Sequence, residues 1–380
     1  MRTNRRCIWT AAAVALAAFL PAFRAVDRAQ LMYVGSGARD AATGIYAFRF
    51  DPTTGKATPL GLAIEARGAS FLAIHPNRKL LYAVASLGGQ NGGAVSAFTI
   101  DRDTGKLALV NTAASRGSGP CFVAVDRTGK NVLVAHYTVG TVAALPIAPD
   151  GRLGEPTAFV EHHGSSVNPE RQKEPHAHSI NVSPDNRFAV AADLGTDRLE
   201  IYRFDAGRGS LAPNDPPHAS VRPGAGPRHF AFHPSGRYAY VINELGSTVT
   251  AFSYDGARGA LTEIQTITTL PAVFQAANYP AEVLVHPSGK FLYGSNRGHD
   301  SIAVFAIDAR RGTLTPVEHV STQGKWPRNF GMDPAGGYLI VANQESGNVV
   351  AFRIDRTTGR LTPTGQTLEV PAPMCVRFVE

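Results

Sequence analysis

The sequence has 380 residues, of which 44% are apolar and 18% are charged. These proportions are those of an ordinary globular protein and exclude a disordered or collagen-like chain. The formal charge of +7 belongs partly to the N-terminus, because the first 25 residues carry four arginines and no acid, which leaves +3 on the remainder. That remainder has no run of lysines and arginines, so we expect no nucleic-acid partner.

Residues 1–29 are predicted to be a signal peptide or an N-terminal anchor. Arg2, Arg5 and Arg6 precede an apolar run over residues 8–23, the order typical of an export signal. The cleavage site lacks small residues, so an uncleaved anchor is the alternative, and the arginine pair is a weak twin-arginine signal. We expect an exported protein, periplasmic or secreted, or a cytoplasmic one if the leader does not function. No membrane partner is expected beyond an uncleaved leader.

After the leader, one unit recurs about every fifty residues, a spacing typical of repeat folds. Each copy has two stretches of alternating apolar residues joined by a Pro- or Gly-containing turn, as two antiparallel strands require. Six copies are LAIHPNRKLLYAVAS from Leu72, VAVDRTGKNVLVAHY from Val123, INVSPDNRFAVAADLG from Ile180, AFHPSGRYAYVIN from Ala231, VLVHPSGKFLYGSN from Val283 and GMDPAGGYLIVANQ from Gly331.

A second turn motif follows each unit and occurs seven times. Its Asp and Gly suit a hairpin between an outgoing and a returning strand, so each unit is predicted to contain four strands. The copies are FDPTTGK from Phe50, IDRDTGKL from Ile100, APDGRL from Ala148, FDAGRGSL from Phe204, YDGARGAL from Tyr254, IDARRGTL from Ile307 and IDRTTGRL from Ile354.

The two chain ends complete a seventh unit. PMCVRFVE at residues 373–380 resembles a first strand, and LMYVGSG from Leu31 resembles a second strand. We therefore predict an all-β fold over residues 30–380, a seven-bladed propeller with four antiparallel strands per blade and one blade closed by both termini. An open solenoid is the less favoured alternative, because it needs no split unit.

The geometry of such blades predicts which residues gather at one mouth of the central channel. Alternate connections fall on opposite faces, so the starts of first strands and the ends of second strands share a face. Six places before the turn position that holds proline in most units lie Ser70, Cys121, His178, Arg228, Ala281 and Arg328, and the split blade contributes Met374. The second strands end in Ala85-Ser86, His136-Tyr137, Asp193-Leu194, Asn243-Glu244, Asn296-Arg297, Asn343-Gln344 and Ser36-Gly37.

Mixed polar residues at a propeller mouth predict a ligand site. We expect substrate binding by Arg328, His136, Asp193, Asn243, Asn296, Asn343 and Gln344. For the three asparagines a turn role is the alternative. For Arg228 and Arg328 the alternative is pairing with acidic residues of neighbouring blades, although arginines also suit bidentate anion binding. Cys121 and Cys375 are expected to be buried apolar side chains rather than a disulfide.

Histidines cluster in the longest link between units. His176 and His178 alternate on one strand, so their side chains are predicted to point the same way. A metal site with His136 and Asp193 is an alternative, but no familiar ligand spacing is present. We therefore expect no metal and no cofactor. Nucleophilic catalysis is disfavoured, because a GxSxG elbow is absent from the sequence.

These motifs resemble the seven-bladed lactonase family, which includes bacterial propeller-type 6-phosphogluconolactonases and fungal carboxymuconate cyclases. The resemblance covers nearly all of residues 30–380 and lies in GPRHFAFHPSGRYAYVINELGSTV, EPHAHSINVSPDNRF, HPSGKFLYGSNRGHDSIAVF and the DxxTGxL hairpins. It implies catalytic roles for a histidine of PHAHS (His176 or His178) and for Arg228, Glu244 and Arg297.

The resemblance also implies an enzyme, a lactonase that hydrolyses a sugar lactone, 6-phosphogluconolactone first among the candidates. A histidine or Glu244 would activate water, and an arginine would stabilise the carbonyl oxygen. The alternatives are a cyclase-like lactonising enzyme and a non-catalytic binding propeller of the cell envelope, whose repeats are similar. We expect a monomer whose partner is a small-molecule lactone or sugar acid. The leader departs from the cytoplasmic lactonases and leaves the substrate open.

Overall fold

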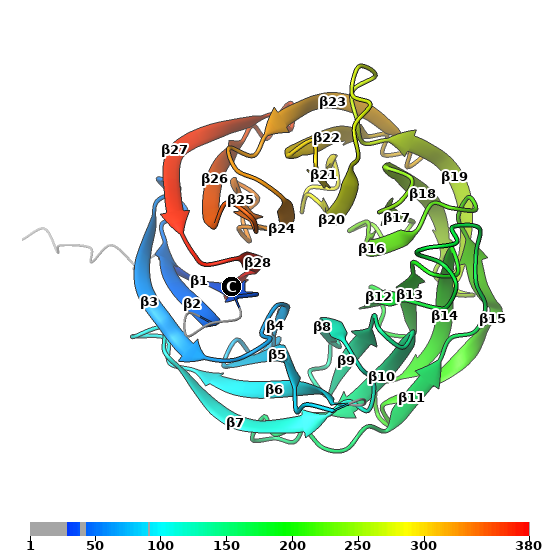
Figure 1. The fold of residues 1–380 in the computed structure, drawn as a ribbon, viewed down its shortest axis with the longest axis horizontal. Coiled ribbons are helices and arrows are strands. Elements are labelled where there is room, and N and C mark those ends of the chain that lie inside the picture. Colours follow the sequence, from blue (N-terminus) through cyan, green and yellow to red (C-terminus); the bar gives the residue numbers. More distant parts are fainter. Residues whose placement is uncertain (1–28, 39–42, 90–91, 380) are drawn as a thin grey trace, which may run out of the picture.

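The computed structural model describes residues 29–38, 43–89 and 92–379. The leader predicted for residues 1–29 falls outside these ranges, apart from Ala29. The described residues form seven sheets of four antiparallel strands, arranged as blades around a central axis (Figure 1). The predicted all-β seven-bladed propeller is confirmed. Within the same ranges, no helix has the length and apolar character needed to cross a membrane.

Each blade runs from an inner strand at the channel to an outer strand at the rim. From the inside outward, the first three blades contain β28 (Pro373–Val379), β1 (Gln30–Ser36), β2 (Gly44–Phe50) and β3 (Ala57–Glu65); β4 (Leu72–Ile74), β5 (Leu80–Ser86), β6 (Gly93–Ile100) and β7 (Leu107–Ala114); and β8 (Pro120–Val125), β9 (Asn131–His136), β10 (Thr141–Pro146) and β11 (Ala158–Glu161).

The next two blades contain β12 (Ala177–Val182), β13 (Phe188–Asp193), β14 (Arg198–Asp205) and β15 (Ser210–Ser220); and β16 (Pro227–Phe232), β17 (Tyr238–Asn243), β18 (Thr248–Asp255) and β19 (Ala260–Thr268). The last two contain β20 (Tyr279–Val285), β21 (Phe291–Arg297), β22 (Ser301–Ile307) and β23 (Leu314–Ser321); and β24 (Pro327–Met332), β25 (Tyr338–Asn343), β26 (Asn348–Ile354) and β27 (Leu361–Glu369).

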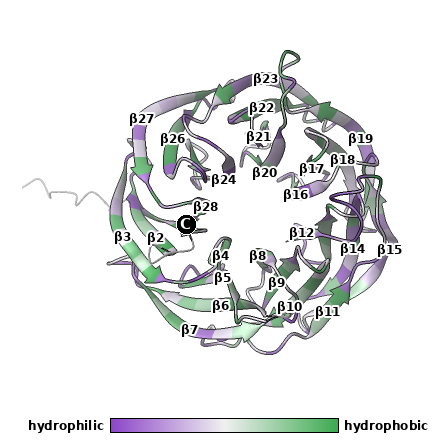
Figure 2. Ribbon diagram, viewed as in Figure 1, coloured by the Kyte–Doolittle hydropathy of each residue, from purple (hydrophilic) through white to green (hydrophobic). Residues whose placement is uncertain are grey.

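How deeply the side chains of a strand are buried depends on the position of that strand in its blade. Second strands such as β9 and β17 are buried at every position, because neighbouring blades cover both of their faces. Outer strands such as β19 alternate, with one face to solvent, and Figure 2 shows this as alternating hydrophilic and hydrophobic segments along the rim. The core is therefore a set of layers between blades.

The repeated sequence motifs also link one blade to the next. A buried tyrosine of the second strand donates its hydroxyl hydrogen bond to the carbonyl of the hairpin glycine in the following blade. These bonds join Tyr33 to Gly105 (3.1 Å), Tyr82 to Gly151 (3.0 Å), Tyr240 to Gly312 (3.0 Å) and Tyr293 to Gly359 (2.9 Å). The glycines have positive φ between 71° and 88°, a conformation that glycine adopts without strain. The hairpin motif thus serves the packing of blades.

The two chain ends close the ring as predicted. β1 pairs with β28 in antiparallel register from Leu31 opposite Val379 to Gly35 opposite Cys375. The inner strand of this blade therefore comes from the C-terminus and the other three strands come from the N-terminus. Closure of this kind leaves no unpaired inner edge between the first and last blades.

Candidate functional site

The mouth of the channel is shaped by β-bulges at the starts of the inner strands. The register shifts by one residue at Pro120/Phe122, Ala177/Ser179, Pro227/His229, Pro280/Val283 and Pro327/Asn329. The residues passed over include Cys121, His178, Arg228 and Arg328. A bulge re-aims side chains next to it, so these inner strands turn their first residues into the channel.

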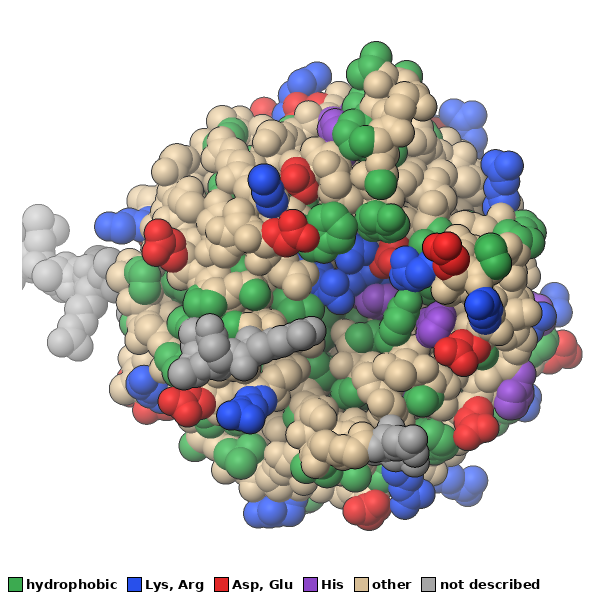
Figure 3. All heavy atoms as spheres, viewed as in Figure 1, with side chains coloured by type: hydrophobic (Ala, Val, Ile, Leu, Met, Phe, Trp, Pro, Cys, Tyr) green, Lys and Arg blue, Asp and Glu red, His purple; other side chains and the backbone are tan. Residues whose placement is uncertain are grey.

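A small enclosed cavity lies where these bulges meet. Its lining contains five of the seven positions predicted to ring the mouth, together with Phe71 and His229; the five are Ser70, Cys121, Arg228, Arg328 and Met374. His178 joins them through a 3.7 Å contact with Cys121, and Arg228 donates to the carbonyl of Ala281 at 2.6 Å. Figure 3 shows basic and histidine side chains gathered in the hollow at the centre of this face. The predicted ring is confirmed as a structural feature.

Glu244 is held by three arginines. Its Oε2 accepts hydrogen bonds from Arg228 Nε at 2.9 Å and Arg297 Nη2 at 2.7 Å, and its Oε1 accepts one from Arg171 Nη2 at 2.8 Å. Burial would raise the pKa of Glu244, but Arg297 and Arg228 hold that pKa well below its usual range. Charge-assisted bonds of this kind are the strong ones, so the carboxylate is a fixed anion and a weak base.

Arg171 was not anticipated from the sequence. It belongs to the long link between β11 and β12, which carries no strand and no repeat signature at this point. Its guanidinium also donates to the hydroxyl of Tyr137 at 3.0 Å, and its side chain is 35% exposed. The link therefore supplies a cation at the rim of the mouth, above Glu244.

Arg328 is the least satisfied of the mouth arginines. Among the described residues, no hydrogen bond or ion pair to its guanidinium is found, although the side chain lines the cavity. Burial lowers the pKa of Arg328 to about 10, and Arg297 adds to that effect. Even a half-buried cation is costly when it has no partner. This arginine is therefore available for an anion that enters the mouth.

His176 and His178 both contact Tyr137, but in different ways. His176 precedes β12 and stacks on the Tyr137 ring with centroids 4.5 Å apart, whereas His178 meets it edge-on at 5.3 Å. The difference arises from the bulge between Ala177 and Ser179, so simple alternation does not describe this strand. Burial and the nearby Arg228 lower the pKa of His178 well below its usual value, which keeps this imidazole neutral.

His229 and Glu282 are two further buried groups that the sequence did not single out. His229 follows Arg228 directly, and strict alternation would turn it away from the channel. Because the bulge in β16 lies at this point, the side chains of Arg228 and His229 both line the cavity. His229 Nδ1 lies 2.9 Å from Glu282 Oε1. A bulge next to the mouth residue is the signal that strand alternation alone misses.

The polar residues that end the second strands divide into two groups. In five of the predicted pairs the first residue bonds to nearby polar groups and does not line the cavity. Asn243 donates to Thr248 and Thr250, Asn296 to Thr269 and Ser301, and Asn343 to Thr322, whereas His136 contacts Ser115 and Thr141, and Asp193 contacts His162 and the backbone of residues 176, 195 and 196. The second residue, as in Glu244 and Arg297, reaches the mouth. The structure thus brings together the arginines and Glu244 but not these five side chains.

Gln344 occupies the same slot as Glu244 and Arg297. Its backbone N–H bonds to the carbonyl of Trp326 at 3.0 Å, and its side-chain Oε1 is buried without a hydrogen-bond partner among the described residues. Arg297 stacks over the ring of the same Trp326, 5.5 Å from its centroid. Gln344 therefore stays a proposed substrate contact.

The turn role of Asn296 predicts a stability effect. Its Nδ2 donates to the Thr269 carbonyl at 2.8 Å, and its Oδ1 accepts from Asn278 at 3.0 Å, in a fully buried setting. Asn296→Ala is expected to lower the free energy of unfolding by about 1–3 kcal/mol, because buried partners lose their bonds. Urea denaturation checks this, and a loss below about 0.5 kcal/mol would contradict the turn role.

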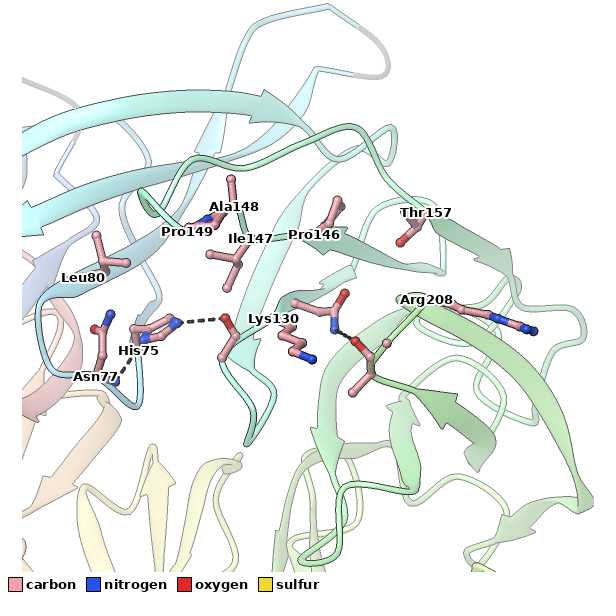
Figure 4. Close-up of a pocket in the computed structure, with 14 residues that line it drawn as sticks. His75, Asn77, Leu80, Lys130, Pro146, Ile147, Ala148, Pro149, Thr157 and Arg208 are labelled. Atoms are coloured by element: carbon pink, nitrogen blue, oxygen red, sulfur yellow. Dashed lines mark hydrogen bonds between the residues drawn. The ribbon is translucent and has the colours of Figure 1, made fainter.

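A polar cavity also lies on the opposite face, between the turns of three blades (Figure 4). It measures about 510 Å³ and is lined by His75, Lys130 and Arg208 among others. His75 Nε2 is hydrogen-bonded to the carbonyl of Gly129 at 2.9 Å. The same bond joins His233 to Gly289 and His286 to Gly336. The two turn motifs therefore share this face, as predicted, and its histidines serve packing between blades.

The metal ligands and cysteines considered in the sequence analysis have other surroundings in the described residues. No three His, Cys, Asp or Glu side chains within them are grouped to hold a metal ion, and His136 and Asp193 have separate partners. Cys121 and Cys375 are free rather than paired. Burial raises the pKa of Cys121 to about 12, so this thiol is a poor nucleophile.

Comparison with known proteins agrees with this architecture. The sequence matches the family described as "Lactonase, 7-bladed beta-propeller" over residues 31–378. It is 39% identical to the 6-phosphogluconolactonase of Bacillus subtilis over 347 residues (91% of this chain and 97% of that protein) and 36% identical to that of Formosa agariphila over 301 residues (77% and 84%).

A solved structure is also similar over nearly the whole chain. The periplasmic gluconolactonase of Pseudomonas aeruginosa superposes with a TM-score of 0.87 at 32% identity, covering 93% of this chain and 99% of that one. The family match spans the blades that carry the mouth as well as the closing strands. The chain belongs to the seven-bladed β-propeller lactonase family.

Proposed function

We propose that the protein hydrolyses a sugar lactone to the corresponding sugar acid, with 6-phosphogluconolactone as the first candidate substrate. The observation that carries this proposal is the charge of the mouth. Arg171, Arg228, Arg297 and Arg328 lie around Glu244, so positive charge is in excess at this small cavity even when the buried Glu282 is counted. A cleft of one sign attracts a substrate of the other sign, and the product of lactone opening is an anion.

The arginines are proposed to divide the work by their pairing. Arg328 is half-buried and has no hydrogen-bond partner among the described residues, so we assign to it the negative charge that develops on the carbonyl oxygen. Arg171 has a 35% exposed side chain and Arg297 is buried against Glu244, and both guanidiniums suit a phosphate or hydroxyl group of the sugar. Bidentate binding of a phosphate fits the fork of a guanidinium, which is why a 6-phosphate substrate is preferred in this proposal.

Glu244 is proposed to hold the arginines rather than to activate water. Its carboxylate already accepts three N–H donors, and the arginines hold its pKa well below the usual range. A general base must have a lone pair within reach of the water that it deprotonates, and both oxygens of Glu244 are already bonded to arginines. Of the two groups suggested by the resemblance, a neutral histidine is therefore the better base.

The proposed cell compartment depends on whether the leader predicted for residues 1–29 acts as an export signal. Residues 1–28 lie outside the described ranges, but one similar enzyme is periplasmic by description. We therefore propose an exported enzyme, for which an unphosphorylated gluconolactone is the alternative substrate.

A lactone panel tests the proposed activity. The full-length protein is expected to accelerate ring opening of both 6-phosphogluconolactone and gluconolactone, measured as acid release above the spontaneous rate. For the phosphorylated substrate, kcat/KM is expected to fall as salt is raised, because screening weakens the cationic mouth. Arg171→Ala should raise its KM by about tenfold, the loss of one charge-assisted contact of about 1.4 kcal/mol. Absence of turnover on every lactone would overturn the proposal and favour a lactonising or binding propeller.

A further inference from the structure

We propose that His229 and Glu282 form a dyad in which His229 removes the proton from the attacking water. This inference rests on the proposed lactone hydrolysis and deepens it. Neither the turn histidines nor the PHAHS histidines have a carboxylate partner that faces the mouth. His229 is the mouth histidine that does, through Nδ1 and Glu282 Oε1 at 2.9 Å.

His229 lines the cavity, and one of its ring nitrogens has no partner among the described residues. The side chain is 3% exposed, and its Nε2 is buried with no hydrogen-bond partner among the described residues. The ring lines the cavity together with Arg228 and Arg328, and Phe71 and Phe122 pack edge-on against it at 5.5 Å and 5.3 Å. The space that the centre of a water molecule can occupy in this cavity is about 20 Å³, enough for about one water. A buried nitrogen without a partner requires an explanation, and a water molecule supplies one.

The hydrogen bonds around Glu282 fix the tautomer of His229. The backbone N–H of Val376 donates to Asn329 Oδ1 at 2.8 Å, so the amide of Asn329 must direct its Nδ2 toward Glu282 Oε2, which it contacts. The backbone N–H of Val283 donates to Glu282 Oε1 at 3.0 Å. Both carboxylate oxygens therefore accept fixed donors. When Glu282 is ionised it has no proton to donate, so His229 Nδ1 carries the proton and donates it to Glu282 Oε1, which leaves the lone pair on Nε2.

The charges that face the dyad come from every side of the channel. Arg228, Arg297, Arg328 and Arg377 surround it, and His178 packs edge-on against His229 at 5.3 Å. Burial raises the pKa of Glu282 to about 7, although Arg377 and Arg228 lower it. Burial and Arg228 lower the pKa of His229. The Glu282 carboxyl therefore loses its proton near neutral pH. Above that pH His229 keeps its Nδ1 proton and has a free lone pair on Nε2.

The proposed hydrolysis has two steps, addition of water and collapse of the intermediate. Water attacks the lactone carbonyl carbon while His229 Nε2 takes one of its protons, and the carbonyl oxygen becomes an oxyanion beside Arg328. The resulting imidazolium is stabilised by the Glu282 carboxylate, as in other carboxylate–histidine pairs. Collapse of the intermediate breaks the bond between the carbonyl carbon and the ring oxygen. That oxygen receives the proton from Nε2, which restores the neutral imidazole and gives the open sugar acid.

His178 is the competing base at this mouth. It lies close by, but its Nδ1 contacts the sulfur of Cys121 at 3.7 Å rather than a carboxylate. An imidazolium at His178 would face Arg228 and Arg328, and the nearby anion Glu244 is already bonded to three arginines. His178 is therefore a contact residue in this scheme, and His229 is the catalytic residue.

The test measures turnover and its pH dependence in full-length variants. His229→Gln is expected to lower kcat by about 10²- to 10⁴-fold, the effect of removing a general base. Glu282→Gln is expected to lower kcat at least tenfold with little change in KM. For the wild-type protein kcat/KM should rise with pH through about 7, corrected for spontaneous opening, because the active dyad is deprotonated. In Glu282→Gln this rise should disappear, an effect that a merely structural role would not produce.

Matched controls separate the outcomes. His233 lies just beyond the same strand and is occupied by Ser235 and Gly289 on the opposite face, so His233→Gln should keep kcat within about twofold. Calorimetric binding of the sugar acid shows whether each variant keeps a folded mouth. If the wild type turns over and His229→Gln does too, or if Glu282→Gln keeps the wild-type pH profile, the dyad is wrong while the proposed function stands. A wild type without lactonase activity overturns the proposed function itself.

Discussion

Replacing Glu244 with alanine is expected to lower the free energy of unfolding by about 3–5 kcal/mol, the cost of removing one partner from a buried ion pair. Arg228, Arg297 and Glu244 are each at most 5% exposed. Without the carboxylate, Arg228 and Arg297 would lie close together in a setting that water does not screen. Urea denaturation measures the effect, and kcat/KM should fall with it because the arginines lose their positions.

The matched control is an exposed pair of the same chemistry. Glu155 lies 3.4 Å from Arg116, and the two side chains are 76% and 56% exposed. Glu155→Ala should change the stability by less than about 1 kcal/mol, as is usual for surface ion pairs. If both alanine variants were equally stable, Glu244 would not be the anion that holds the mouth together.

Arg328→Met is expected to reduce activity while leaving the fold as stable as before or more stable. Removal of a group that stabilises an oxyanion costs about 10²- to 10³-fold in kcat. The side chain has no bonded partner among the described residues, and burial lowers its pKa to about 10. A methionine of similar length should therefore stabilise the fold by about 1 kcal/mol, a trade-off expected at functional sites.

Thermal unfolding and lactone turnover on one protein preparation check this prediction. Arg208→Met provides the control, because Arg208 lines the cavity of the opposite face with an 85% exposed side chain. Its kcat should stay within about twofold of the wild type. A large loss of stability in Arg328→Met would mean that this arginine has a structural partner and is not reserved for a ligand.

Repeat arithmetic predicted the architecture because one blade is a single local pattern. The HPSG and DxxTG turns have local causes, an Asx turn and a positive φ, so they are visible in the sequence, and counting back from the turn reached Arg228 and Arg328. The split blade was visible because each terminus carries part of the same pattern. Such signals depend on neighbours in the sequence, and a sequence reading can recover them.

The residues that the sequence did not reveal depend on breaks in that regularity. His229 reaches the cavity only because a bulge interrupts the alternation of β16. Arg171 lies in the long link between β11 and β12, which contains no strand. Strand periodicity therefore could not predict that its side chain reaches Glu244. The asparagines that end the second strands make structural hydrogen bonds, which explains why asparagine recurs there. The residue that follows the asparagine is Glu244 in one blade and Arg297 in the next, and these two side chains meet at the mouth.

A crystal structure with the product sugar acid bound would test most directly whether the arginine-lined mouth is the site of lactone opening. The account predicts that the new carboxylate contacts Arg328, that its carbon lies within reach of a water on His229 Nε2, and that the far end of the sugar faces Arg171 and Arg297. Binding in the opposite cavity beside Lys130 and Arg208, with the mouth unchanged, would contradict it.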